Sequence, residues 1–165
     1  MSAPRKRTVA KRGTATTSAV PPAPRLLARV PVPVRWGDLD AFNHVNNAAF
    51  LVYAQEARLE WLAGIGGQWF DESAMPVVAA AHVNYRRQLA WPARIVVELE
   101  ATRIGTTSVT IAHRIVADGD AACVHADGEV VMVWIDPAAG TPVQLPDAIR
   151  LACQSGTESA GTTSK

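Results

Sequence analysis

The sequence predicts one α+β domain in which a curved antiparallel sheet wraps around a single long helix. One segment repeats its apolar residues at helical spacing, whereas the segments after it alternate apolar and polar residues with a period of two. Tight turns separate those later segments, and strands joined by tight turns pair antiparallel. The chain has 165 residues, 48% of them apolar, which suits one domain with one core.

The first expected strand covers residues 30–36. Its apolar residues alternate with two prolines and an arginine: Val30, Val32, Val34 and Trp36 against Pro31, Pro33 and Arg35. Proline has no amide hydrogen to donate to a neighbouring strand. We therefore expect the side of the strand that carries the prolines to lack a complete hydrogen-bond ladder.

The long helix is expected at residues 46–63. Apolar residues recur along one of its faces: Phe50, Tyr53, Ala54, Ala57 and Trp61. Four more make the other faces apolar as well: Leu51, Val52, Leu59 and Leu62. We therefore expect the helix to be largely buried. Asn46 suits the N-cap, and the glycines that follow residue 63 suit the end of the helix.

Four strands are expected after the helix, at residues 77–89, 94–103, 108–117 and 121–135. Turn sequences around Gly105 and Gly119 separate the last three of them. A short terminal helix is expected at residues 147–153.

Charge is distributed unevenly along the chain. Residues 1–29 carry seven basic and no acidic residues, whereas residues 30–165 carry nine basic and fifteen acidic residues, a net charge of −6. A nucleic-acid-binding domain should carry its basic face on the fold, so we expect no nucleic-acid partner. We expect a disordered basic tail at residues 1–26, a folded domain at residues 27–153 and a disordered tail at residues 154–165. A transit peptide or a tether to an anionic surface are alternative roles for the basic tail.

Several other function classes lack their sequence signals. No apolar run approaches the 18 residues of a membrane span, so none is expected. Cys123 and Cys153 belong to no metal or redox motif, and we interpret them as free thiols of a cytoplasmic protein. The histidines of the strands lack ligand spacing, so we expect no metal site and no cofactor. The motifs of serine α/β-hydrolases and of phosphate-binding loops are absent.

Residues 35–47, between the first strand and the helix, suggest chemistry. They include Asp38, Asp40 and His44, and they end in Asn46 and Asn47 at the start of the helix. A helix N-terminus offers unpaired N–H groups and a positive dipole, which stabilise a carbonyl oxygen as it becomes an oxyanion. A carboxylate beside it could attack the carbonyl or deprotonate water. The pattern indicates acyl transfer or hydrolysis, and the alternative is a set of caps and turn formers.

Residues 38–47, Asp-Leu-Asp-Ala-Phe-Asn-His-Val-Asn-Asn, resemble the active-site segment of hotdog-fold thioesterases. The segment is similar to the 4-hydroxybenzoyl-CoA thioesterase family. It is more similar to bacterial long-chain acyl-CoA thioesterases and plant acyl-carrier-protein thioesterases, which share an Asp followed four residues later by His-Val-Asn-Asn. The resemblance covers about residues 28–150 and implies a hotdog fold.

The resemblance also implies a metal-independent thioesterase of fatty acid metabolism that hydrolyses acyl-CoA to a free acid and coenzyme A. Asp40 matches the catalytic carboxylate, which acts as nucleophile or general base. The backbone N–H of Asn47 would polarise the thioester carbonyl, and His44 matches a histidine beside the reacting centre. Asp38 matches an acidic position that holds the loop.

Six more residues are expected to bind substrate: Trp36, Phe42, Asn46, Arg86, Arg87 and Arg103. Arginine suits the phosphates of coenzyme A by its fork geometry, and the alternative for these three is ordinary surface charge. Phe42 stands where the plant-type enzymes carry Asn, which makes it a candidate pocket wall. Glu56 is expected to make a buried structural hydrogen bond rather than to act in catalysis.

Relatives of this kind pair two sheets into one, with active sites at the subunit interface, and many form tetramers. We therefore expect a homodimer or homotetramer that pairs through the second strand. Three alternative functions are a non-catalytic acyl-binding protein on the same fold, an acyl-carrier-protein thioesterase and a hotdog dehydratase. The acidic folded part disfavours the carrier-protein enzyme, and the residue arrangement of a dehydratase is not visible.

Overall fold

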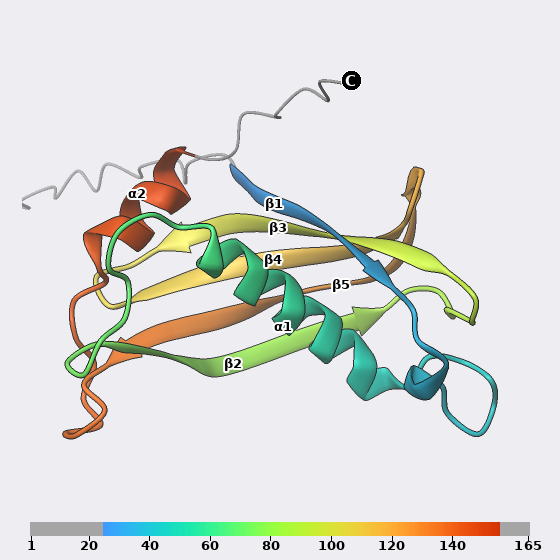
Figure 1. Cartoon of the computed structure of the whole chain (residues 1–165), viewed down its shortest axis with the longest axis horizontal. Helices are drawn as coiled ribbons and strands as arrows, with labels where there is room; N and C mark the ends of the chain where they lie inside the picture. Colours follow the sequence, from blue (N-terminus) through green and yellow to red (C-terminus); the bar gives the residue numbers. More distant parts are fainter. Residues whose placement is uncertain (1–24, 156–165) are drawn as a thin grey trace, which may run out of the picture.

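The computed structural model of the chain describes residues 25–155. In chain order the elements are β1 (Arg25–Pro33), the 3-10 turn η1 (Trp36–Asp38), α1 (Asn47–Ala63), β2 (Met75–Tyr85), β3 (Arg94–Ile104), β4 (Ser108–Ala117), β5 (Asp120–Ile135) and α2 (Asp147–Ser155). The strands and α-helices are labelled in Figure 1. Regular structure reaches two residues beyond each predicted domain limit, and the rest of the two predicted tails lies outside the described residues.

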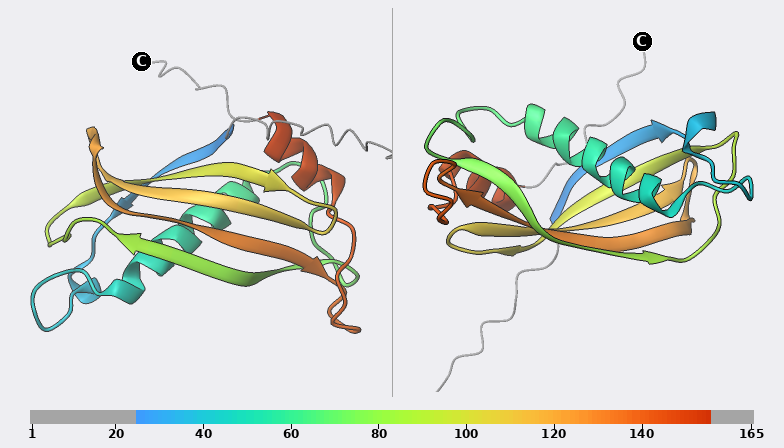
Figure 2. Two further views of the ribbon diagram at one scale, coloured as in Figure 1. Left: turned by 180° about the vertical axis from the view of Figure 1, so that it is seen from behind. Right: turned by 90° about the horizontal axis from the view of Figure 1, so that it is seen from below.

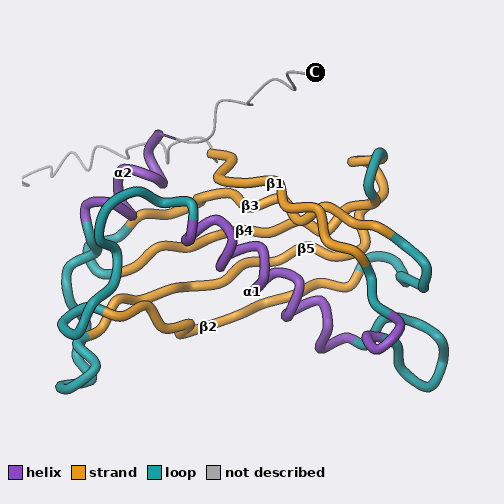
Figure 3. Tube along the Cα trace, in the orientation of Figure 1, coloured by secondary structure: helices purple, strands orange, loops and turns teal. Residues whose placement is uncertain are grey.

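The five strands form one antiparallel sheet in the order β1-β3-β4-β5-β2. α1 crosses one face of this sheet diagonally, and the strands curve around it (Figures 1 and 3). Figure 2 shows that α1 lies on one side of the sheet only, while α2 packs at one end beside β1 and β3. The predicted α+β arrangement of a sheet wrapped around a long helix is therefore confirmed.

The hydrophobic core fills the space between α1 and the sheet. Burial along β4 largely follows the period of two expected for a strand with one covered face, whereas residues 95–99 of β3 are all buried. The largest fully buried side chains include Tyr53 of α1, Leu99 of β3, Ile111 of β4 and Trp134 of β5. Because these residues come from every layer of the fold, the position of α1 on the sheet is set by packing.

β1 forms one edge of the sheet and pairs only with β3, so the expected incomplete ladder on its proline side is confirmed. The strand ends at Pro33 instead of continuing to Trp36. The chain turns there because the Asp38 amide donates to the carbonyl of Arg35 at 3.0 Å and forms η1.

β2 forms the other edge and ends at Tyr85, four residues before its predicted end. The amides of Arg86 and Arg87 both donate to the carbonyl of His125, at 2.9 and 3.1 Å, so the chain leaves the regular ladder at this point. The segment from Arg86 to Leu89 consequently crosses towards the loop before α1, where the amide of Val45 donates to the carbonyl of Leu89 at 2.7 Å.

The predicted burial of α1 is only half correct. The face towards the sheet is buried, but Leu51, Val52 and Leu59 on its other faces are exposed. The helix packs against one sheet, so a single chain covers only the stripe that faces the strands. Within residues 25–155 no helix combines the length and apolarity that a membrane crossing requires.

Candidate active site

The loop between η1 and α1 is closed at its base by backbone hydrogen bonds. The amide of Asn46 donates to the carbonyl of Asp38 at 2.8 Å, and the amide of Asp40 donates to the carbonyl of His44 at 2.8 Å. Leu39 and Val45 form an antiparallel bridge between these two bonds. The loop is therefore a short hairpin that carries Asp40 on one arm and His44 on the other.

The tip of this hairpin holds the carboxylate of Asp40 in a fixed orientation. Its Oδ1 accepts hydrogen bonds from the amide of Phe42 at 2.8 Å and the amide of His44 at 3.3 Å. Asn43, between them, has a φ of 59°, a left-handed conformation that asparagine tolerates better than most residues. Among residues 25–155, Oδ2 of Asp40 has no hydrogen-bond partner, which leaves one oxygen free for chemistry.

The hairpin leads directly into the N-terminus of α1. As predicted, Asn46 is the N-cap, and its side-chain oxygen accepts from the amide of Ala48 at 2.9 Å. Asn47 is the first residue of the helix, so its amide has no helical carbonyl four residues earlier to bind. The positive end of the helix dipole is concentrated at this amide. An electron-rich carbonyl oxygen could therefore bind here.

Most of the predicted site residues line one open pocket of about 560 Å³. It is lined by Asp40, Phe42, His44, Val45, Asn47, Phe50, Tyr85, Arg86, Arg87, Gln88 and Leu89. The three predicted catalytic residues therefore lie around one space. Phe42 is 80% exposed and forms one wall, which is where the sequence placed it.

The pocket also contains residues that the sequence did not single out. Helical periodicity predicts Phe50 as a core residue, and the structure places it both in the core and along the pocket. Tyr85 contacts it edge-to-face at a ring-centroid distance of 5.5 Å, and its hydroxyl donates to the carbonyl of Asn47 at 3.1 Å. The remaining additions are Val45, Gln88 and Leu89. Apolar periodicity identifies such residues as buried but does not indicate that they also border a cavity.

Three of the predicted substrate-binding residues do not line this pocket. Trp36 is 74% exposed in η1, and Asn46 uses its side chain to cap α1. Arg103 lies near the end of β3, where it pairs with Thr110. Tyr85, at the pocket end of β2, is level with Val97 of β3 in the register of the sheet. Arg103 lies further along β3, about 20 Å from Val97 at the rise of a strand.

The two arginines in the pocket have different partners. Arg86 makes a two-pronged contact with Asp127, with nitrogen–oxygen distances of 2.7 and 3.0 Å. Arg87 makes only a weak contact to the thiol of Cys123 at 3.5 Å and has no carboxylate partner among the described residues. Since Arg87 has no counter-ion there, it is the better candidate to receive an anionic group.

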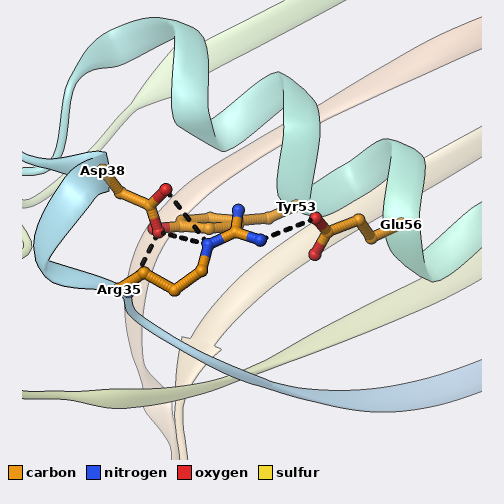
Figure 4. Close-up of polar contacts among 4 residues, drawn as sticks. All are labelled: Arg35, Asp38, Tyr53 and Glu56. Carbon is orange, nitrogen blue, oxygen red and sulfur yellow. Dashed lines mark hydrogen bonds and ion pairs between the residues drawn. The ribbon is translucent and has the colours of Figure 1, made fainter.

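A second polar cluster is built around Asp38, at the base of the hairpin (Figure 4). The carboxylate of Asp38 accepts from the amide of Arg35 at 2.9 Å, from its Nε at 3.2 Å and from the hydroxyl of Tyr53 at 2.7 Å. Burial opposes ionisation of Asp38, but the hydrogen bonds from Tyr53 and Arg35 outweigh it and lower the pKa of this carboxyl. Burial, followed by the bond to Asp38, raises the pKa of Tyr53. At neutral pH Asp38 is therefore a carboxylate that binds a neutral phenol.

Glu56 lies at the outer end of the same cluster, where it forms an ion pair of 3.2 Å with Nη1 of Arg35. The predicted structural hydrogen bond is therefore present, but the side chain is 41% exposed, so the predicted burial is wrong. The side chain points towards Arg35, and it does not line the pocket. Elsewhere among residues 25–155, no three His, Cys, Asp or Glu side chains are grouped so as to hold a metal ion.

Comparison with known proteins places these features in a family context. Residues 34–152 match the family model of the thioesterase-like superfamily. A protein of Xanthomonas campestris proposed to be an acyl-CoA thioesterase is 47% identical, with 73% of this chain and 99% of that chain covered and a TM-score of 0.66. A proposed thioesterase of Pseudomonas aeruginosa is 36% identical, with 78% and 98% covered and a TM-score of 0.73.

A thioesterase of Thermus thermophilus, solved in complex with coenzyme A and zinc, is 34% identical to this chain. The alignment covers 79% of this chain and 93% of that one, with a TM-score of 0.67. The fold agrees with these structures over nearly their whole length.

Proposed function

We propose that this chain, which belongs to the thioesterase-like superfamily, hydrolyses acyl-coenzyme A to a free acid and coenzyme A. It is a thioester hydrolase with the hotdog fold, as the family match and its similarity to thioesterase structures indicate. One observation carries the proposal for the site. The Asp40 carboxylate and the Asn47 amide line the same pocket at the start of α1.

In the proposed mechanism the thioester carbonyl oxygen binds at the Asn47 amide. Negative charge that develops on this oxygen is stabilised by the amide and by the helix dipole. Asp40 then either attacks the carbonyl carbon, forming an anhydride that water later cleaves, or removes a proton from an attacking water. In both routes the carbon–sulfur bond breaks and coenzyme A leaves as the thiolate. The free oxygen of Asp40 serves either route.

The remaining pocket residues support substrate contacts in the proposed complex. His44 lies next to Asp40 and would orient it or bind the attacking water. Phe42, Phe50 and Tyr85 provide apolar surface for the acyl group. Arg87, with no carboxylate partner among the described residues, would receive a phosphate of coenzyme A.

We also propose that two copies pair through β2. This strand is an edge of the sheet and presents apolar residues to solvent, including Met75 and Val78. An exposed apolar edge strand is a ready template for another strand. A mass in solution of one chain, 17.6 kDa, would exclude the dimer and the tetramer. We place the reaction in the cytoplasm, where the free thiols of Cys123 and Cys153 would stay reduced.

The test is thiol release from a panel of aliphatic and aromatic acyl-coenzyme A substrates by the wild type and by Asp40→Asn. We expect the wild type to release thiol from one class, and the variant to retain the fold but lose at least about a hundredfold in kcat. Binding of acyl-coenzyme A without turnover would instead support a non-catalytic acyl-binding protein. Turnover of acyl-carrier-protein substrates alone would identify the carrier protein, rather than coenzyme A, as the thiol that carries the acyl group.

A further inference from the structure

Asp38 joins three parts of the structure that meet beside the pocket. Its carboxylate binds Arg35, two residues after the end of β1, and Tyr53 in the second turn of α1. Its backbone carbonyl accepts from Asn46, the residue that caps α1. Figure 4 shows the guanidinium of Arg35 in front of the Tyr53 ring, between the carboxylates of Asp38 and Glu56. One residue therefore connects the strand, the helix and the base of the hairpin.

The chain distances from this junction to the reacting groups are short. Asp40 follows Asp38 by two residues, and Asn47 follows Asn46 by one. The hairpin between them is closed by the Asp40 and Asn46 backbone bonds, so it moves as a unit. A shift of Asp38 relative to α1 would change the separation between the Asp40 carboxylate and the Asn47 amide. Catalytic groups must be held within fractions of an ångström of their productive geometry.

Tyr53 is suited to fix this separation. Its side chain is fully buried, and its backbone lies within the helix that presents the Asn47 amide. Its hydroxyl makes the 2.7 Å bond to a charged acceptor, and charge-assisted hydrogen bonds are about twice as strong as neutral ones. Arg35, by contrast, is half exposed and holds Asp38 from the solvent side.

We infer that Tyr53 and Asp38 are positioning residues for the reaction, because their hydrogen bond ties the hairpin that carries Asp40 to the helix whose first amide is that of Asn47. This inference rests on the proposed function, since it assigns both residues an effect that acts through Asp40. Neither side chain lines the pocket. Their loss should therefore change the rate of the chemical step and leave substrate binding largely intact.

The test compares Tyr53→Phe, which removes only the hydroxyl, with Asp38→Asn and with Glu56→Gln as a matched control. Glu56→Gln changes the outer end of the same cluster and leaves the Tyr53–Asp38 bond in place. We expect kcat to fall about ten- to a hundredfold in the first two variants, with KM within about twofold of the wild type. Glu56→Gln should keep both values. Thermal unfolding of each variant confirms that the assay temperature lies below its transition.

A double-mutant cycle separates positioning from a general loss of stability. In an Asp40→Asn background, Tyr53→Phe should cost no further kcat, because the group it positions is gone. An equal loss in both backgrounds, or a wild-type kcat for Tyr53→Phe, would overturn the inference. If the wild type releases no thiol from any substrate, the proposed function fails separately. In that case the NMR amide resonances of Phe42 and Asn47 test the positioning inference. They must shift in Tyr53→Phe and stay unchanged in Glu56→Gln.

Discussion

His113 of β4 lies directly opposite Gly128 of β5 in the sheet, on the face that α1 covers. His113 is 1% exposed, and neither of its ring nitrogens has a hydrogen-bond partner among residues 25–155. Nη1 of Arg58, from α1, is likewise buried without a partner there. Gly128 therefore lies opposite a buried polar side chain, and burial without hydrogen-bond partners is unfavourable for both His113 and Arg58.

Replacement of Gly128 by alanine should destabilise the protein. A Cβ at this position would overlap the carbonyl oxygen of His82 on the paired strand β2, and backbone in a sheet yields little. We expect the free energy of unfolding to fall by about 2 to 3 kcal/mol. Urea denaturation measures the change. Gly66→Ala is the control, because a Cβ there meets nothing within 4 Å, and an equal loss in both variants would contradict the steric explanation.

His113 should make the protein sensitive to acid. Burial, together with the nearby charge of Arg58, lowers the pKa of His113 to about 4, from an ordinary value of 6.5. Between these values the unfolded chain binds a proton that the folded chain does not. The contribution of neutral His113 to the free energy of unfolding is therefore fully present above pH 6.5. It is lost as the pH drops towards 4, by up to about 3 kcal/mol.

Denaturation of His113→Leu at pH 7 and pH 4.5 checks this assignment. The variant should lose less stability than the wild type between the two pH values. His82→Leu, a change of an exposed histidine on β2, should stay close to the wild type, because His82 makes the smallest contribution to the lowered pKa of His113. A variant that keeps the full pH dependence would assign the acid sensitivity to other groups.

Arg87 should contribute more to nucleotide binding than Arg86 or Arg103. Asp127 already neutralises Arg86, and Arg103 lies at the far end of β3. We expect Arg87→Ala to raise KM for acyl-coenzyme A about tenfold with kcat nearly unchanged, since a charged hydrogen bond contributes roughly 1.5 to 3 kcal/mol. The same variant should behave like the wild type on an acyl-pantetheine substrate, which lacks the nucleotide. A larger effect from Arg103→Ala would reverse this ranking.

Removal of divalent metal should leave hydrolysis unchanged. The proposed mechanism uses the Asn47 amide and the helix dipole to stabilise the oxyanion, and no group of three ligating side chains occurs within residues 25–155. Dialysis against a chelator should therefore preserve kcat and KM. A loss of activity that zinc restores would contradict the metal-independent mechanism.

The local parts of the site could be predicted from the sequence because they depend on residues close in the chain. Asn46 caps α1 two residues ahead of its partner amide, and Asp40 binds the amides of Phe42 and His44. Hydrogen bonds over two to four residues follow from residue type and spacing. The strands and the helix were predicted for the same reason, since apolar periodicity is a local property.

Only the tertiary structure decided which distant residues complete the site and which surfaces stay open. The pocket needs the segment from Arg86 to Leu89, which arrives because β2 ends early and binds His125. Arg103 looked equivalent to the pocket arginines Arg86 and Arg87 in the sequence, but strand register places it elsewhere. The outer face of α1 is apolar yet exposed, because periodicity identifies an apolar face and does not specify what will cover it.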